Sequence, residues 1–174
     1  MNVSGINFES IVDGEGVRVV IFVSGCRHNC KGCHNPASHS FTAGQPFTEK
    51  LQREIIDYIH HTRFISGLTL SGGDPMYSAK ELTPFISKLR KEIQGLSVWV
   101  YSGFTYEEIQ KDSEMWELLT MCDVLVDGEF ILEQRDITLA YKGSKNQRII
   151  DIQKSIKQKS IVLWESEAYE SSDY

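Results

Sequence analysis

Short apolar runs alternate along the chain with segments of helical periodicity, and this alternation constrains the fold more than any other feature. The β-rich runs are residues 17–23 (VRVVIFV), 67–71 (GLTLS), 97–101 (SVWVY) and 123–127 (DVLVD). The segments with helical spacing are residues 48–61, 78–93 and 114–121. This order predicts parallel strands joined by right-handed crossovers. We therefore expect an α/β fold, as a sheet or an incomplete βα barrel, with functional loops at the carboxyl ends of the strands.

The helical segments indicate which residues enter the core and where the helices begin. Apolar side chains recur every three or four residues and so share one helix face at Leu51, Ile55, Ile56, Ile59, Leu82, Phe85, Ile86, Leu89 and Ile93. Ser78 and Glu81 have the spacing of a capping box, and so do Thr105 and Glu108. We therefore expect one helix to begin after Ser78 and another after Thr105.

The chain is expected to form one domain followed by a short tail. Of its 174 residues, 41% are hydrophobic and 24% are charged, as in an ordinary globular protein. Residues 146–157 fit either a helix or an extended segment, and residues 160–164 (SIVLW) predict a last strand. We expect a single domain over residues 1–164 and a solvated acidic tail over residues 165–174.

The acidic balance excludes several functions. A net charge of −6 without a cluster of lysine and arginine argues against nucleic acid or an anionic membrane as partner. The first ten residues do not read as a signal peptide, and no apolar run is long enough to span a bilayer. We therefore expect a cytoplasmic protein. In a reducing compartment its four cysteines favour metal or redox chemistry over disulfide bonds.

Three cysteines follow the first of the apolar runs in the stretch VSGCRHNCKGCHNP, residues 23–36. Cys26, Cys30 and Cys33 have the spacing C-x3-C-x2-C, and Gly25 and Gly32 allow the turns that would direct the three sulfurs inward. Three thiolates would leave one iron of a four-iron cluster open. A zinc site with His28 or His34 as fourth ligand fits the spacing equally well, and reduced surface cysteines without a metal are a further alternative.

A second motif, LSGGDP, ends the next strand. Ser71, Gly72, Gly73 and Asp74 would lie on the same side of the sheet as the cysteines, because parallel strands end together. The glycines expose backbone groups to a close ligand, and the carboxylate suits an ammonium group. Alone, such a stretch is more often a simple turn. The pairing with the cysteines one strand earlier favours a binding site.

Together these motifs resemble the radical S-adenosylmethionine superfamily. There, C-x3-C-x2-C binds a four-iron cluster and a Gly-Gly-acid-Pro turn holds the amino group of S-adenosylmethionine. The lead-in VDGEGVRVVIFVSGC, with Asp13, Gly14, Gly16 and Arg18, resembles that of the glycyl-radical activating enzymes. The blocks CKGCHNP, LSGGDP, VYSGFTYEEI, DVLVDGEF and YKGSKNQRIID are similar to those of the activators of anaerobic ribonucleoside-triphosphate reductase. The resemblance covers most of residues 5–164.

The resemblance implies a partial βα barrel, a [4Fe-4S] cluster and S-adenosylmethionine as cofactors. The implied cluster ligands are Cys26, Cys30 and Cys33, and the implied cofactor-binding residues are Gly32, Cys33, His34, Ser71, Gly72, Gly73, Asp74 and Ser102. Reductive cleavage would give methionine and a 5′-deoxyadenosyl radical, which would take a hydrogen atom from a glycine of the reductase partner. The family's electron donor is a flavodoxin-type protein. No catalytic side chain beyond the cofactors is expected. The oligomeric state, a homodimer included, is left open.

Some positions near the motifs allow two interpretations. Many superfamily members carry an aromatic residue before the third cysteine, where this chain has Gly32, so His34 is expected to contact the cofactor or to pack within the loop. Ser102 and Gly103 resemble the strand end that approaches the methionine carboxylate or the ribose, or they form an ordinary turn. Asp127 could face the same mouth or belong to an Asp-Gly turn.

For most of the other charged and metal-ligating residue types we expect structural roles, and for two arginines we consider two roles. Arg18 and Arg148 could contact cofactor or partner, or form structural ion pairs. Cys122 is expected to be a small buried side chain rather than a fourth ligand. His28 is expected to face solvent rather than to bind metal. The remaining histidines, at loop and helix-end positions, are His39, His60 and His61.

Two alternatives to the reductase activator stay open on the sequence. Within the superfamily, the chain could activate another glycyl-radical enzyme, such as pyruvate formate-lyase, or act as a 7-deazaguanine-type synthase. From a different class, it could be a small iron–sulfur electron carrier or a zinc-binding module. Neither an electron carrier nor a zinc-binding module would bind S-adenosylmethionine, and neither would explain the motif from Ser71 to Pro75.

Overall fold

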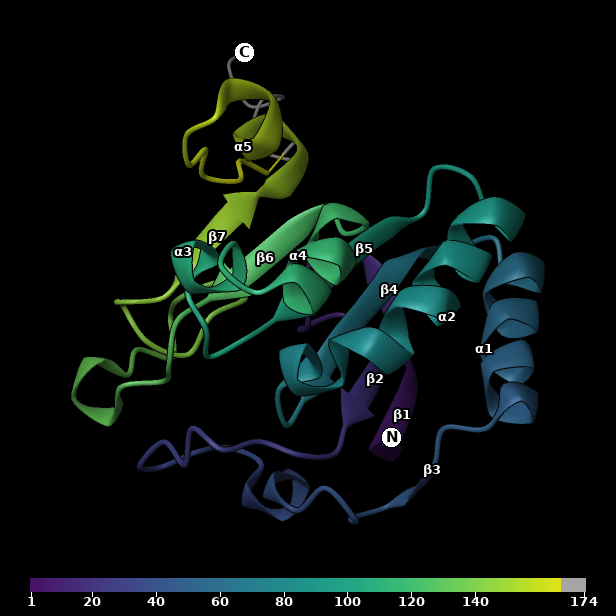
Figure 1. Cartoon of the computed structure of the whole chain (residues 1–174), viewed down its shortest axis with the longest axis horizontal. Helices are drawn as coiled ribbons and strands as arrows, with labels where there is room; N and C mark the ends of the chain where they lie inside the picture. The colour runs from purple at the N-terminus through teal and green to yellow at the C-terminus, as the bar shows by residue number, and fades with distance from the viewer. Residues whose placement is uncertain (167–174) are drawn as a thin grey trace.

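All the strands within residues 1–166, the part of the chain that the computed structural model describes, belong to one seven-stranded sheet (Figure 1). They are β1 (Asn2–Ser10), β2 (Val17–Val23), β3 (Gln45–Pro46), β4 (Ile65–Gly72), β5 (Ser97–Tyr101), β6 (Val124–Asp127) and β7 (Arg148–Asp151). The order is β3-β1-β2-β4-β5-β6-β7, so the sheet is open, with β3 and β7 as its edges. Most of the expected acidic tail, residues 167–174, lies outside the described residues.

The central strands run parallel, as the sequence predicts, and the outer strands do not. β2, β4, β5 and β6 pair in parallel, whereas β1 is antiparallel to β2 and β7 is antiparallel to β6. The α/β prediction is thus confirmed as a mixed α/β fold. The incomplete barrel of the radical S-adenosylmethionine type and the single domain over residues 1–164 stay predictions.

Three strand assignments differ from the sequence expectations, and one of them is the two-residue edge strand β3, which no sequence pattern predicted. The sequence patterns did not predict β1, whose apolar and polar residues alternate imperfectly and whose pairing with β2 contains register shifts. The strand predicted at 160–164 is wrong, because this segment contributes only an isolated bridge between Leu163 and Ile150. The backbone N–H of Val162, in this segment, donates to the hydroxyl of Ser155 and therefore cannot pair with a neighbouring strand.

Four of the five helices lie between strands in the chain, as expected from the alternation, and α5 follows β7. They are α1 (Glu49–His61), α2 (Ala79–Glu92), α3 (Tyr106–Ile109), α4 (Ser113–Thr120) and α5 (Ile152–Gln158). Single turns of 3-10 helix are η1 (Pro36–His39), η2 (Pro75–Ser78) and η3 (Leu132–Gln134). The ambiguous segment 146–157 contains both β7 and α5. No helix within residues 1–166 has the length and apolar character that crossing a membrane would require.

One of the two predicted capping boxes is present. The Thr105 hydroxyl accepts from the N–H of Glu108, whose carboxylate accepts from the N–H of Thr105. The other helix does begin after Ser78, as predicted, but its capping box is absent, since the Ser78 side chain makes no capping hydrogen bond. The chain already turns helically in η2, so its first free N–H groups come earlier, and Asp74 accepts one of them from Met76.

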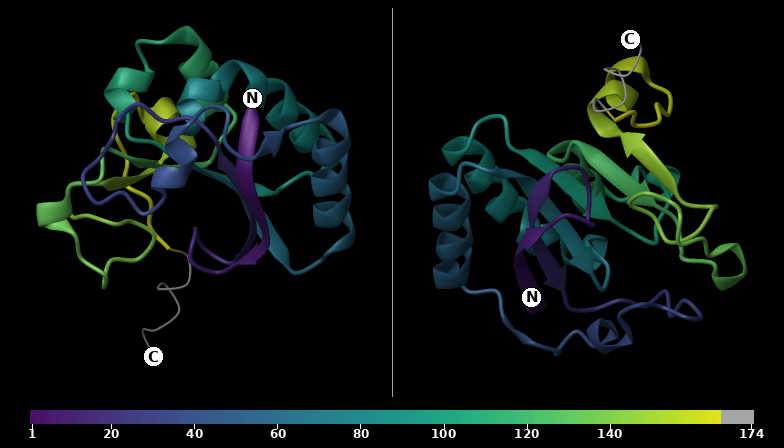
Figure 2. Two further views of the ribbon diagram at one scale, coloured as in Figure 1. Left: turned by 90° about the horizontal axis from the view of Figure 1, so that it is seen from below. Right: turned by 180° about the vertical axis from the view of Figure 1, so that it is seen from behind.

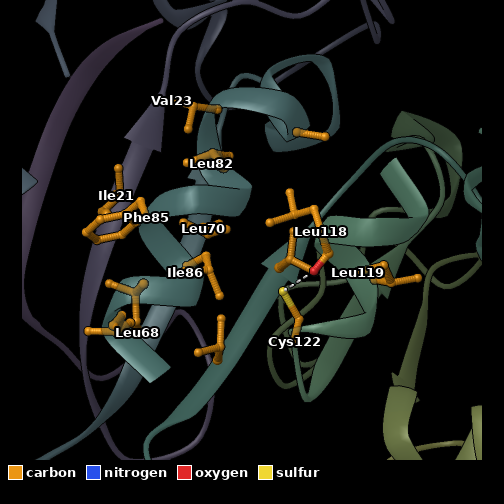
Figure 3. Close-up of a cluster of buried hydrophobic side chains, with 14 of the residues drawn as sticks. Ile21, Val23, Leu68, Leu70, Leu82, Phe85, Ile86, Leu118, Leu119 and Cys122 are labelled. Atoms are coloured by element: carbon orange, nitrogen blue, oxygen red, sulfur yellow. Dashed lines mark hydrogen bonds between the residues drawn. The ribbon is translucent and has the colours of Figure 1, made fainter. Parts of the chain in front are cut away.

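The core lies between the sheet and the helices that cover one of its faces (Figure 1). Figure 3 shows Ile21, Leu68 and Leu70 of the sheet near the helix side chains. Four of the five residues predicted for one face of α2 are fully or almost fully buried: Leu82, Phe85, Ile86 and Leu89. The fifth, Ile93, lies just past the end of the helix and is only partly buried. Cys122 is also buried, as predicted, and its thiol donates to the carbonyl oxygen of Leu118 (3.4 Å).

The opposite face of the sheet holds a buried arginine that has a structural role. Arg18 is 1% exposed, stacks over Trp99 and donates to the hydroxyl of Thr69 and to the carbonyl oxygens of Glu15, Leu68 and Ser97, at 2.7–2.9 Å. Burial lowers the pKa of Arg18 to about 10. Arg18 has a structural role, because it is buried and donates mainly to backbone carbonyl oxygens. These acceptors are neutral, so Arg18 does not form the ion pair that the sequence suggested.

Candidate functional site

Three of the four cysteines lie on the segment after β2. Cys26, Cys30 and Cys33 are free and partly exposed, and they line one pocket of about 510 Å³. In Figure 1 and in the right-hand view of Figure 2, this segment and the loop after β6 lie at the same end of the sheet. Gly25 (φ 107°) and Gly32 (φ 76°) have left-handed backbones, as the predicted turns require. The three thiols therefore border a common space.

We define the cysteine loop as residues 24–39, because backbone hydrogen bonds close it at both ends. The N–H of Gly25 donates to the carbonyl of Ser38 (2.7 Å), and the N–H of Cys26 donates to that of His39 (3.1 Å). The 3-10 turn η1 brings these acceptors back to the beginning of the loop. The loop is thus a closed unit that holds its thiols at the end of β2.

The thiols differ in their surroundings. Burial raises the pKa of both Cys26 and Cys30 above that of a free thiol. The sulfur of Cys33 lies 3.4 Å from Nε2 of His39 and also accepts the backbone N–H of Asn35 (3.4 Å). The sequence assigned His39 only a loop position, since no spacing rule relates it to Cys33; the contact arises from the turn η1.

The Gly-Gly-Asp-Pro turn follows β4 and contacts the cysteine loop directly, as the parallel register of β2 and β4 requires. The N–H of Gly73 donates to the carbonyl of Val23 (2.8 Å), and the N–H of Asp74 donates to that of Gly25 (2.9 Å). A Cβ atom on Gly73 would lie 2.5 Å from the carbonyl oxygen of Gly25. Only glycine lets the two loops approach this closely.

Asp74 is 1% exposed and connects several elements at the edge of the pocket. Its carboxylate accepts from the N–H groups of Met76 and Gly103, both at 2.9 Å, and from the hydroxyl of Ser102 at 3.0 Å. Nε2 of His28 lies 2.8 Å from its Oδ2 atom. Asp74 therefore already has several donors from the chain itself, and Ser102, predicted to lie at a functional strand end, is one of them.

The two histidines of the cysteine motif have different positions. The prediction that His28 faces solvent is wrong: its side chain is 9% exposed and its ring lies between the carboxylates of Asp74 and Glu129. The hydrogen bond with Asp74 raises the pKa of His28. His34 lines the pocket and lies 5.7 Å from the ring of Phe130, so it is placed for either of the roles considered.

Most of the predicted site residues border the same pocket. Those in its lining are Cys26, Cys30, Cys33, His34, Ser71, Gly72, Gly73, Asp74 and Ser102. Gly32 is not, and a Cβ atom there would instead meet Leu132 at 3.0 Å. Further lining residues that the sequence analysis did not propose as cofactor-binding include Asp13, Phe22, His28, His39, Tyr101, Phe130 and Gln147. For Phe22 and Tyr101 the available signal was strand alternation, which places them on the face opposite the helices.

Asp127 and Arg148 form a structural pair beside the pocket. Asp127 is 1% exposed and accepts from the N–H of Tyr106 (2.9 Å) and from Nε of Arg148 (3.0 Å). Arg148 also pairs with Glu107 (2.8 Å). The hydrogen bond between Arg148 and Asp127 raises the pKa of Arg148. The hydrogen bond between Arg148 and Glu107 lowers the pKa of Glu107. Neither Asp127 nor Arg148 lines the pocket.

The donor set suits an iron–sulfur cluster better than a single metal ion. Within residues 1–166, no group of three or more His, Cys, Asp or Glu side chains is arranged to hold one ion. His28 was one candidate for a fourth zinc ligand. Both of its ring nitrogens are instead within hydrogen-bond distance of carboxylates, those of Asp74 and Glu129. An iron–sulfur cluster takes thiolates that are spread around a larger core, and the three cysteines of this loop border one pocket.

Comparisons with known proteins agree with this chemistry. A family model described as a 4Fe-4S single cluster domain matches residues 12–150. The anaerobic ribonucleoside-triphosphate reductase-activating protein of Pasteurella multocida is 42% identical over 142 residues, which cover 80% of this chain and 90% of that protein. The protein of the same name from Escherichia coli K12 is 36% identical over 140 residues (79% and 90%), and that of enterobacteria phage T4 is 34% identical over 151 residues (86% and 93%).

Proposed function

Because this chain belongs to the family of the anaerobic ribonucleoside-triphosphate reductase-activating proteins, with their 4Fe-4S domain, we propose that it installs a glycyl radical on such a reductase by cleaving S-adenosylmethionine reductively. The observation that carries this proposal is the contact between two motifs. The cysteine loop and the Gly-Gly-Asp-Pro turn border one pocket, joined by backbone hydrogen bonds.

Cys26, Cys30 and Cys33 would hold the cluster, each through its deprotonated sulfur. Burial disfavours the thiolate at Cys26 and Cys30 in the cluster-free protein, and bonding to iron would reverse this preference. Cys122 is too deeply buried in the hydrophobic core to act as a fourth ligand. Three protein ligands leave one iron open for S-adenosylmethionine.

The turn after β4 would bind the methionine part of the cofactor. Ser71, Gly72 and Gly73 line the pocket with little side-chain bulk, so that backbone groups can meet the ligand. Asp74 supplies negative charge at the same edge, where it favours an ammonium group. Ser102 would orient Asp74 or approach the carboxylate or ribose, and His34 would pack against the cofactor. These roles assume the partial βα barrel of the radical S-adenosylmethionine enzymes.

A reduced cluster at this site would supply the one electron that cleaves the sulfonium, giving methionine and a 5′-deoxyadenosyl radical that takes a hydrogen atom from a backbone glycine of the reductase. The chain's own residues would bind the cofactor, orient it and exclude water, and no general base is required. An electron donor of the flavodoxin type would serve in the cytoplasm. The partner's glycine loop would enter this same pocket, whose lining also includes Phe130 and Gln147.

The test is an anaerobic assay of the reconstituted protein with S-adenosylmethionine and a chemical reductant. The account predicts equimolar methionine and 5′-deoxyadenosine, and loss of both in the Cys30→Ala variant. An iron–sulfur electron carrier would leave S-adenosylmethionine intact. Intact cofactor in the presence of a fully assembled, reduced cluster would therefore overturn the proposal.

A further inference from the structure

His28 lies where the loops after four parallel strands meet. It belongs to the cysteine loop after β2, and its ring contacts Asp74 after β4, Phe104 after β5 and Glu129 after β6. Among the described residues of the cysteine motif, His28 alone has a side chain that hydrogen-bonds with Asp74. The position of this one ring thus affects every loop at the carboxyl end of the parallel strands.

The ring contacts three other loops and also lines the pocket. Its Nε2 atom lies 2.8 Å from Oδ2 of Asp74, and Nδ1 lies 2.9 Å from Oε1 of Glu129. The centroid of Phe104 is 4.6 Å away at an edge-on angle. A Cβ atom on Gly103 would lie 2.6 Å from the ring, so glycine is needed there to admit the histidine. With both nitrogens at carboxylates, His28 is not available as a cluster ligand.

We propose that His28 is a positioning residue that couples the cysteine loop to the cofactor-binding turn by fixing the carboxylate of Asp74. This inference rests on the proposed function, because the quantity that it sets is the affinity for S-adenosylmethionine. His28 would not bind iron and would not touch the reacting atoms. It would act through Asp74 alone, while Glu129 on its outer side would only support the ring.

The reason lies in the burial and charge of Asp74. The buried carboxylate of Asp74 is 1% exposed and depends on donors from the protein. Its Oδ2 atom meets Ser102 and Gly103 from the loop after β5, and His28 is its partner from the cysteine loop. Glu129 is different, because its side chain is 54% exposed and water can replace its bond to the ring. Loss of the inner contact should therefore change the site, whereas loss of the outer contact should not.

The chain offers a matched set of variants. His28→Gln keeps an amide N–H near the position of Nε2, toward Asp74, whereas His28→Asn keeps one near Nδ1, toward Glu129. His28→Phe keeps the ring packing and removes both donors. Glu129→Gln leaves the bond to Asp74 in place and serves as the control.

The measurement is equilibrium binding of S-adenosylmethionine to each anaerobically reconstituted protein, together with its iron and sulfide content. We expect normal cluster content throughout. The dissociation constant should rise about tenfold or more in His28→Phe and His28→Asn, and should stay near that of the unmodified protein in His28→Gln and Glu129→Gln.

Two results would overturn the inference. Equal affinity in all the variants would show that the contact with Asp74 does not set cofactor binding. Loss of the cluster in Phe, Asn and Gln variants alike would show that His28 only folds its loop. Both outcomes leave the proposed function standing as long as the unmodified protein binds S-adenosylmethionine. If the unmodified protein, with its full cluster, does not bind it, the proposed function fails and this inference fails with it.

Discussion

The backbone N–H of Asp74 donates a 2.9 Å hydrogen bond to the carbonyl oxygen of Gly25, and this bond joins the turn after β4 to the loop that carries three cysteines. Gly73 makes the neighbouring bond to Val23, so the two loops share a short backbone seam. The seam holds the loop that carries the thiols against the Gly-Gly-Asp-Pro turn. Substitutions on either side of it should therefore disturb both loops.

Gly73→Ala tests the seam. The added methyl group would lie 2.5 Å from the carbonyl oxygen of Gly25, so one loop must move, and we expect a loss of about 1–3 kcal/mol in the free energy of unfolding. Gly5→Ala is the control, because its Cβ atom would meet only Phe22, at 3.9 Å, and should change stability by about 0.5 kcal/mol or less. Urea unfolding of the cluster-free proteins measures both. Equal stability of the two variants would contradict the close approach.

Alanine at each cysteine tests the ligand assignment. Anaerobic reconstitution of the unmodified protein should give about four iron and four sulfide per chain. Cys26→Ala, Cys30→Ala and Cys33→Ala should each lose the intact cluster, since each removes one of three thiolates. Cys122→Ala should keep it, because Cys122 is fully buried in the core, among residues such as Leu118. Loss of iron in the Cys122 variant would refute this ligand set.

Thiol alkylation separates the same residues without a cluster. Burial raises the pKa of Cys122 to about 12, so at pH 8 almost none of it is the reactive thiolate, and reagent cannot reach it. The native cluster-free protein should therefore take up three carbamidomethyl groups from iodoacetamide, and a fourth only after addition of urea. Intact-mass spectrometry counts the groups. A rapid fourth modification of the native protein would show that Cys122 is accessible.

Arg18→Met tests the structural role of the buried arginine. The substitution keeps much of the volume but leaves the carbonyl oxygens of Leu68 and Ser97 without their donor, which should cost about 3 kcal/mol of unfolding free energy. Arg53→Met is the matched control, and it should cost much less, because its ion pair with Asp57 is exposed. Thermal and denaturant unfolding would compare them. A loss no larger than that of the Arg53 variant would contradict the assigned role.

The sequence predicted the parts of the fold that depend on local periodicity. β2, β5 and the helices α1 and α2 have nearly the bounds that their apolar patterns indicated. β1 was missed because its strand character depends on pairing with β2, which a local pattern does not report. The Ser78 cap failed for a related reason: the preceding turn η2 already supplies the start of the helix.

The site was predictable in its motifs but not in its contacts. Most of the residues that the cysteine spacing and the Gly-Gly-Asp-Pro turn identified do line the pocket. The sequence wrongly predicted that His28 faces solvent. Its partners Asp74 and Glu129 are distant in the chain and come next to His28 only when the strands pair. The contact of His39 with Cys33 likewise depends on the turn η1. Side-chain partners across loops require the folded arrangement.

The central claim is that this chain generates a glycyl radical on an anaerobic ribonucleoside-triphosphate reductase, and electron paramagnetic resonance tests it most directly. The reconstituted protein is mixed anaerobically with the reductase of the same organism, S-adenosylmethionine and a reductant, beside a reductase whose radical-site glycine is replaced by alanine. The account predicts a glycyl radical signal on the intact reductase and none on the alanine variant. Absence of the signal with intact reductase, or an equal signal with both, would contradict it.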